Sequence, residues 1–381
     1  STPYSVDISP DGQLLVFGSG GNYGGGGITL VDLTTLGEVA SALGEPEVAV
    51  RFECVRPEGY ESVRPENSGR GGQHMANACG LPEDERQLEL TVSGVAFDGS
   101  GRYLAASTWR TPRESGPVFV FRVVDGRRLD HFATFCRSRH PLLISDWPNG
   151  ICWGDGGSVW VRRGFISINA NALQRVDTGA TSATRNRPHR SESRLATMAG
   201  SSDRAVTGMR GDLAVADPTR EGGSLLVVSS GRRTDSSPVT AVLSLSGRIL
   251  TGHCDGSIAA WENGSDDEFN WCPPVNLRPP QKKDPHPNIR YRTYTPSSIV
   301  AMCALKESGR QFFSADANGE IVQWTLANPD GRSCCAVRTY ELPGLGTPRC
   351  LAVHSPARRG PLLVVGVKAP HQGDRRGYMA V

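Results

Sequence analysis

Length, composition and charge limit what this chain can be. At 381 residues it can hold two ordinary domains or one large all-β domain, and 45 glycines with 26 prolines and only 7% aromatic residues favour many short elements over long helices. A formal net charge of +2 excludes a strong overall attraction to nucleic acid or to a membrane surface.

The predicted elements follow one repeated phrase, a turn followed by a strand of the form Gly-x-apolar-x-x-apolar. Glycine suits such turns because it adopts the positive φ angles that tight hairpins need. Apolar residues alternate or run continuously before most of these turns, which is typical of paired strands. We expect each segment to be the third strand of a four-stranded unit. In chain order the segments begin at Gly26, Gly116, Gly157, Gly211, Gly256, Gly319 and Gly377.

The spacing of these segments indicates the fold. It corresponds to a unit of about 40 residues with insertions, which is the period of a propeller blade. A single four-stranded blade cannot cover both of its faces, whereas a closed ring of blades can. The sequence therefore predicts an all-β fold with almost no helix, a seven-bladed β-propeller of four-stranded antiparallel blades with loop insertions. Six or eight blades are the alternative, because the unit around Gly211 fits the pattern least. The approximate blades of this single domain, 1–381, are residues 3–55, 90–137, 138–180, 195–233, 237–263, 297–343 and 347–381.

Three stretches fall outside the predicted blades. Residues 56–89 are rich in glycine, proline and charge, and residues 182–194 are rich in arginine. Residues 264–296 combine proline pairs with a tryptophan and two tyrosines among polar residues, which is typical of interface anchors. We expect these aromatic residues to contact a partner, with packing against the blade rim as the alternative. They are Trp271, Tyr291 and Tyr294.

The last predicted blade stops in its third strand, so we expect it to have no fourth strand within the chain. The sequence also lacks an initiator methionine. An open strand edge is a liability for a sheet protein. We therefore interpret the sequence as a piece of a longer polypeptide, or as a propeller closed by a strand from elsewhere.

Two of the units carry a family resemblance. The segments "TGHCDGSIAAWEN" and "SADANGEIVQWTL" resemble the units of WD-repeat (WD40) β-propellers, in which Gly-x-x-Asp-Gly-x-Ile-x-x-Trp closes each repeat. The resemblance implies a structural role for Asp255 beside Gly256, with Asn318 at the matching place beside Gly319. No unit reads Trp-Asp, so the resemblance indicates the architecture without a subfamily.

Trp261 and Trp324 each follow an isoleucine, Ile258 or Ile321, by three positions. Residues three apart on a strand point to opposite faces. Because a blade has a neighbour on each face, we expect both tryptophans and both isoleucines to be buried.

No catalytic, metal-binding or cofactor-binding motif is present. The chain has no P-loop, no H-E-x-x-H, no kinase H-R-D and no G-x-S-x-G, and no two of its eight histidines are four residues apart. His253, Cys254 and Asp255 could form a nucleophile or metal cluster, but the matching turn of the next unit has no ligand set, which favours a structural trio. The ten cysteines include no C-x-x-C, so free thiols in a reducing compartment are expected. We predict no catalytic residue, no metal and no cofactor.

The sequence therefore favours a non-catalytic scaffold that presents its loops to other proteins in a multi-subunit assembly. A propeller enzyme with an active site in its central channel is one alternative. An RNA-contacting propeller subunit of a ribonucleoprotein is another, because the segment "RNRPHRSESR" is basic. No apolar window reaches the length of a membrane helix and no leader peptide is recognisable. We expect an intracellular protein, cytoplasmic or nuclear, without membrane insertion.

Overall fold

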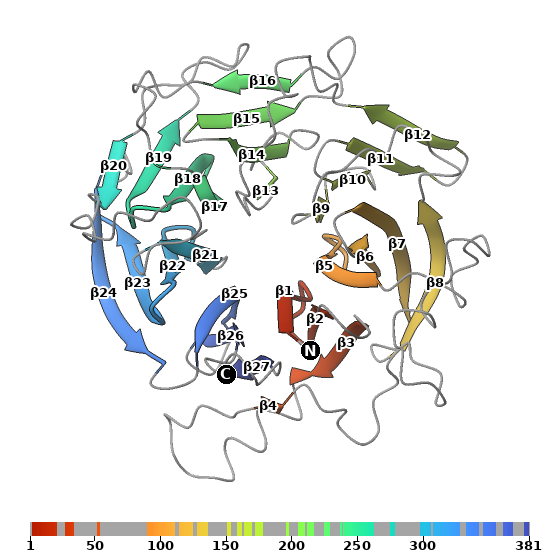
Figure 1. Cartoon of the computed structure of the whole chain (residues 1–381), viewed down its shortest axis with the longest axis horizontal. Coiled ribbons are helices and arrows are strands. Elements are labelled where there is room, and N and C mark those ends of the chain that lie inside the picture. The colour runs from red at the N-terminus through yellow and green to blue at the C-terminus, as the bar shows by residue number, and fades with distance from the viewer. Residues whose placement is uncertain are drawn as a thin grey trace. The chain divides into compact units, whose positions relative to one another are not determined.

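Figure 1 shows a computed structural model of the chain, in which every described element with printed bounds is a β-strand. Its contacts divide the chain into two units. The first unit is Ser1–Trp153 with Arg349–Val381, and the second is Gly154–Pro348. The structure describes residues 2–20, 27–33, 52–53, 90–110, 114–124, 128–135, 151–153, 158–161, 164–169, 172–177, 196–197, 205–209, 212–216, 225–228, 237, 239–262, 275–278, 298–305, 308–327, 333–342, 346–355, 361–368 and 377–380.

The first unit contains three antiparallel sheets among the described residues. Their strand orders are β1-β2-β3, β5-β6-β7-β8 and β25-β26-β27-β4. The strand β9 (Ile151–Trp153) packs against β5 and β6. The bounds of the other strands are β1 Thr2–Ile8, β2 Leu14–Gly20, β3 Gly27–Asp32, β4 Phe52–Glu53, β5 Leu90–Phe97, β6 Tyr103–Arg110, β7 Glu114–Val124, β8 Arg128–Phe135, β25 Thr347–His354, β26 Leu362–Lys368 and β27 Gly377–Ala380.

The second unit contains four sets of antiparallel strands within the part of the chain that is described. They are β10-β11-β12, β13-β14-β15-β16, β17-β18-β19-β20 and β21-β22-β23-β24. Their bounds are β10 Ser158–Val161, β11 Gly164–Asn169, β12 Ala172–Asp177, β13 Ala196–Thr197, β14 Ala205–Met209, β15 Asp212–Ala216, β16 Leu225–Val228, β17 Val239–Leu245, β18 Arg248–His253, β19 Ile258–Glu262, β20 Val275–Arg278, β21 Ile299–Leu305, β22 Gln311–Asp316, β23 Glu320–Leu326 and β24 Cys334–Glu341.

The strand β2 is buried along its whole length because both of its faces are covered. Leu14 and Val16 belong to an apolar cluster shared with the sheet β5–β8. Leu15 and Phe17 belong to a second cluster, shared with β25 and β26. Since successive side chains of a strand point to opposite faces, the run Leu-Leu-Val-Phe contributes to two cores at once.

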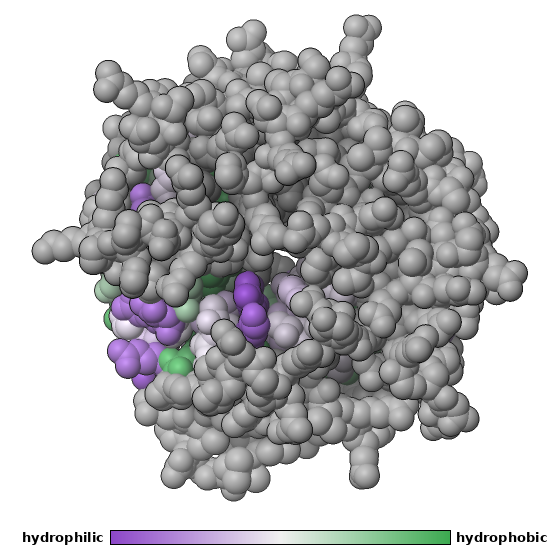
Figure 2. Space-filling view, in the orientation of Figure 1, coloured by the Kyte–Doolittle hydropathy of each residue, from purple (hydrophilic) through white to green (hydrophobic). Residues whose placement is uncertain are grey.

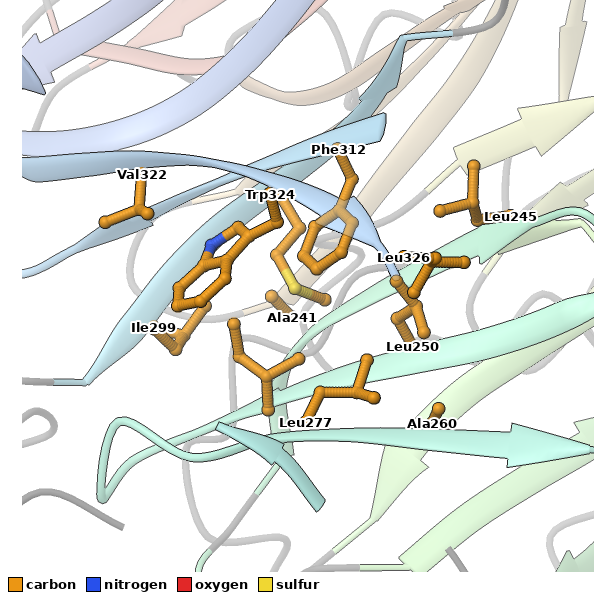
Figure 3. Close-up of a cluster of buried hydrophobic side chains, with 12 residues drawn as sticks. Ala241, Leu245, Leu250, Ala260, Leu277, Ile299, Phe312, Val322, Trp324 and Leu326 are labelled. Atoms are coloured by element: carbon orange, nitrogen blue, oxygen red, sulfur yellow. The ribbon is translucent and has the colours of Figure 1, made fainter. Parts of the chain in front are cut away.

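The sheets β17–β20 and β21–β24 pack on one another through a third cluster, shown in Figure 3. Ile258 comes from one sheet, and Phe312 and Trp324 come from the other. The rings of Phe312 and Trp324 stack with centroids 6.2 Å apart. The cluster as a whole joins the faces of two neighbouring sheets, which is the packing that a propeller requires.

Polar side chains also link innermost strands of neighbouring sheets. The carboxylate of Asp7 on β1 accepts a hydrogen bond of 2.7 Å from the backbone N–H of Phe97 on β5. In the second unit, the hydroxyl of Thr240 on β17 donates to the carbonyl of Ile299 on β21. These bonds satisfy backbone groups at sheet edges that no further strand pairs.

The strand β4 corrects two expectations. It pairs antiparallel with β27, with Phe52 opposite Met379 and Glu53 opposite Tyr378. The last sheet therefore has a fourth strand from within the chain, and the predicted first blade, 3–55, extends too far. The sequence could not indicate this pairing because β4 has two residues and its partner lies at the other end of the chain.

Six of the seven Gly-x-apolar segments coincide with third strands, but the segment from Gly157 does not. It forms β10, and the strand order places β11 between β10 and β12. In the strand order of this sheet β9 is first and β10 is second, so the third place belongs to β11, Gly164–Asn169. The poorly patterned segment after Gly211 forms β15, inside a four-stranded sheet. The total of seven blades stays a prediction.

The predicted insertion 264–296 also contains a strand. Its residues Val275–Arg278 form β20, the fourth strand of its sheet, so this sheet extends beyond the predicted end at residue 263. Leu277 is buried against the preceding strands. This four-residue strand was not recognisable in the sequence because proline pairs stand on both sides of it. The predicted insertions 56–89 and 182–194 lie outside the described residues.

Candidate interaction surface

The turn before β19 is held by a carboxylate. Asp255 Oδ1 accepts hydrogen bonds from the backbone N–H of Ser257 (3.0 Å) and from its hydroxyl (2.6 Å). Gly256 has a φ of +79°, in the left-handed region that glycine adopts without strain. The residues predicted for a structural turn thus form one.

The matching turn before β23 uses a different carboxylate. Asp316, not Asn318, accepts from the backbone N–H groups of Asn318 (2.9 Å) and Glu320 (3.0 Å). The side chain of Asn318 is exposed, and Gly319 has a φ of +99°. Matching the two units had indicated Asn318 as the side chain that holds this turn, whereas the acceptor is Asp316, two residues earlier. The sequence could not decide between them, because either Asp or Asn can begin such a turn.

Replacing Asp255 with alanine is expected to lower the free energy of unfolding by about 1–2 kcal/mol, because Ser257 is buried and loses the acceptor for two donors. Urea unfolding would measure the loss. Asn318→Ala is the matched control and should change stability by much less. An equal loss in the two variants would contradict this assignment.

Both tryptophans of the WD-like units donate to a hydroxyl on the second strand. Trp261 Nε1 lies 2.9 Å from Thr251 Oγ1, and Trp324 Nε1 lies 2.9 Å from Ser314 Oγ. Ile258 shares the cluster of Figure 3 with Trp324, whereas Trp261 is not part of that cluster. The two tryptophans and the two isoleucines are all buried, which is the burial expected from their spacing.

His253 takes part in this network. Its Nε2 is 2.9 Å from the Thr251 hydroxyl, and its Nδ1 is 2.9 Å from the Ser237 carbonyl. A carbonyl accepts only, so Nδ1 carries the proton and Nε2 accepts from Thr251. Both ring nitrogens of His253 are therefore engaged in hydrogen bonds within the fold. No group of three or more His, Cys, Asp or Glu that could hold a metal ion occurs among the described residues.

Cys152 on β9 is expected to resist alkylation in the native protein. Burial raises the pKa of its thiol to about 12, so at about pH 8 only about one molecule in ten thousand carries the reactive thiolate. Cys335 on β24 is exposed and free, and serves as the internal reference. Iodoacetamide labelling followed by peptide mass mapping measures both sites. Equal labelling rates at the two cysteines would contradict this expectation.

A partly exposed aromatic cluster lies on β6 to β9 in the first unit, with Phe132 exposed and Tyr103 and Trp153 half-buried. The rings of Tyr103 and Phe132 meet edge to face at 5.3 Å, and Trp153 lies 6.4 Å from Tyr103. Trp153 is fixed by a hydrogen bond of 2.8 Å from Nε1 to the Ala96 carbonyl. The guanidinium carbon of Arg122 lies 5.7 Å from the centre of the Phe132 ring. We call Tyr103, Arg122, Phe132 and Trp153 the aromatic patch.

Phe132 is exposed because of a β-bulge. The pairing of β7 with β8 shifts between Val120 and Phe121, which leaves Phe132 as the extra residue of β8. The shift between Gln323 and Trp324 likewise leaves Val337 extra on β24. These two residues, 41% and 54% exposed, are the large exposed apolar side chains of the described part of the chain. A bulge commonly re-aims a side chain at a sheet edge.

The surface around β24 is more polar than the aromatic patch. Most of its side chains are exposed, and the guanidinium of Arg338 lies 5.0 Å above the Tyr340 ring. In Figure 2, the coloured surface at the position of β23 and β24 is mainly hydrophilic, with small apolar areas.

The remaining predicted site residues are only partly covered by the structure. Gly116 lies in β7 and Gly377 begins β27. The predicted partner contacts Trp271, Tyr291 and Tyr294, and the turn residues Gly26, Gly157 and Gly211, lie outside the described residues. Sequence reasoning missed the aromatic patch, because an aromatic residue within a strand normally predicts burial.

Comparison with solved structures shows the fold. The chain has the WD40 β-propeller fold, and three similar structures match all of it: U3-55K (TM-score 0.58, 12% identity, 95% of that chain), the RRP9 WD40 repeats (0.59, 12%, 94%) and the Myceliophteria thermophila Swd1 β-propeller domain (0.56, 13%, 96%). No protein-family model matches the sequence, and no curated protein matches it. The described residues include no helix that is long and apolar enough to cross a membrane.

Proposed function

We propose that this chain is a non-catalytic scaffold that binds other proteins within a multi-subunit assembly of the cytoplasm or nucleus. The aromatic patch is the observation that carries this proposal. Arginine and large aromatic residues are enriched at the centres of protein interfaces, and here Arg122 and Phe132 are exposed together, beside the half-buried Tyr103 and Trp153. The WD40 propeller fold supports the proposal as a rigid frame, although a fold alone does not specify a function.

The test is the state of the protein in its source cells. The chain would be tagged at its chromosomal locus and purified at low salt, and its native mass would be measured by native mass spectrometry. We expect a stoichiometric complex with other proteins. Recovery of the protein alone would contradict the scaffold, and turnover of a substrate by the purified chain would favour the enzyme alternative.

A further inference from the structure

The cross-strand pair of Tyr103 and Arg122 differs from the pair at the corresponding place of another sheet. On β18 and β19, Arg248 lies opposite Glu262, and the pair forms an ion pair of 2.8 Å. On β6 and β7 the corresponding cross-strand pair is Tyr103 and Arg122. The first unit thus has an aromatic residue where the second unit has one member of an ion pair.

The guanidinium of Arg122 lies over an aromatic ring. Arg122 is exposed, and the contact found for it among the described residues is the Phe132 ring. Asp130 is its cross-strand neighbour on β8, but Asp130 takes part in interactions of its own and forms no ion pair with Arg122 within the described structure. An arginine held over a ring keeps its N–H groups free to donate in a fixed plane.

We propose that the aromatic patch binds a carboxylate of an extended segment in a partner protein, a proposal that rests on the scaffold function above. Arg122 would donate two parallel hydrogen bonds to an Asp or Glu of that segment, which is the preferred geometry of this pair. An apolar residue beside the acid packs on the exposed face of Phe132. The partner's carboxylate would thereby form an ion pair with Arg122 between two molecules, as Glu262 forms one with Arg248 within the sheet β17–β20.

The strand β8 suits an extended segment. It is the last strand in the order of its sheet, so the edge away from β7 has backbone groups that no further strand of this sheet pairs. Extended peptides commonly bind proteins by pairing with such an edge, and their side chains then meet the patch on the neighbouring face. The bulge at Phe132 interrupts regular pairing and limits the contact to a short segment.

The charges favour a protein over a nucleic acid as the occupant. Binding to a phosphate backbone requires several cations that each neutralise a phosphate. The patch has one arginine, and the chain carries a net charge of only +2. One cation with apolar rings around it matches a single acid in an apolar context.

The experiment uses the full chain and a random peptide library displayed on phage. Peptides selected on the wild-type protein are synthesised with a fluorescent label, and their binding is measured by anisotropy. We expect the selected peptides to be enriched in Asp or Glu next to an apolar residue. Arg122→Gln and Phe132→Ala should each weaken binding about tenfold or more, the effect of a central interface residue.

Arg102→Gln is the matched control. Arg102 is also exposed, is adjacent to Tyr103 and bonds Ser100 in its own turn, so its removal changes the charge equally without touching the patch. Its binding should equal that of the wild type, and thermal melts should show all three variants folded. Peptides without acids, or affinities unchanged by Arg122→Gln, would overturn the proposal.

Competition by oligouridine would also overturn it, because it would identify a nucleic-acid site. These failures are distinguishable from failure of the scaffold function. A protein that enters a complex in its source cells, but whose patch selects no acidic peptide, retains the scaffold function and loses only this site.

Discussion

Replacing Trp261 with alanine is expected to lower the free energy of unfolding by about 3–5 kcal/mol. The side chain is only 1% exposed, and its Nε1 donates to Thr251. The substitution removes the largest fully buried side chain found in the described structure and leaves a cavity in its place. The loss is a large share of the about 5–15 kcal/mol that stabilises a typical domain. Urea unfolding, followed by far-ultraviolet circular dichroism of the backbone, measures this loss of stability.

Two controls separate volume from hydrogen bonding. Trp261→Phe retains much of the apolar volume and loses the N–H, so it should cost clearly less than the alanine variant. Trp271→Ala, in the predicted partner-contact segment, should leave folding stability unchanged. Equal destabilisation by Trp261→Ala and Trp271→Ala, or no effect of the former, would show that the structural role belongs to a different tryptophan.

Replacing Gly252 with alanine is the second large expected effect, a loss of about 1–3 kcal/mol from overpacking. A Cβ at this position would lie 2.4 Å from Cγ2 and 2.7 Å from Cβ of Ile299, on the first strand of the neighbouring sheet. Because one of these atoms is close to the Ile299 backbone, rotation of the side chain cannot relieve the contact. The two sheets must separate, which weakens the cluster of Figure 3.

Thermal and urea unfolding of Gly252→Ala would be compared with Gly99→Ala. A Cβ at Gly99 would meet nothing within 4 Å, and this control should be close to neutral. A second variant pair, Gly252→Ala with Ile299→Ala, should lose less stability than the sum of the single losses, since the clash is shared. Additive losses would argue against a direct contact.

The same close approach recurs in the first unit, where a Cβ at Gly18 would lie 2.5 Å from Val92. Gly18 and Gly252 both lie on the second strand of a sheet and face the first strand of the next sheet. The sequence pattern assigns glycine only to turns. A glycine within a strand also marks a close approach of two backbones, and this signal was present in both segments.

The sequence predicted the parts of the fold that depend on neighbouring residues. The turns at Gly256 and Gly319 and the strands after them follow from local φ preferences and from alternation of side chains. The Gly-x-apolar pattern assigned a third strand to the segment from Gly157, whereas the third strand begins at Gly164. Both segments fit the start of the pattern equally well. Local pattern alone cannot decide which of two successive strands is third.

Features that depend on distant residues were not predictable. The exposure of Phe132 results from a one-residue shift between β7 and β8, and nothing in the segment "RLDHFATF" encodes that shift. Asp316 takes the carboxylate role of its turn, although Asn318 occupies the place that matches Asp255. The candidate surface therefore emerged only from the pairing of the strands.

The pairing of β4 with β27 has a consequence for the order of folding. Residues Gly154–Pro348 form one continuous unit, whereas the other unit combines residues from both sides of it. During synthesis, β4 leaves the ribosome long before β27 exists, and the sheet that joins them cannot be completed until the intervening unit has been made. Contacts between such distant residues carry a high loop-closure entropy and form slowly. The sheet that contains β4 and β27 is therefore completed late, and only in a chain whose translation has included β27.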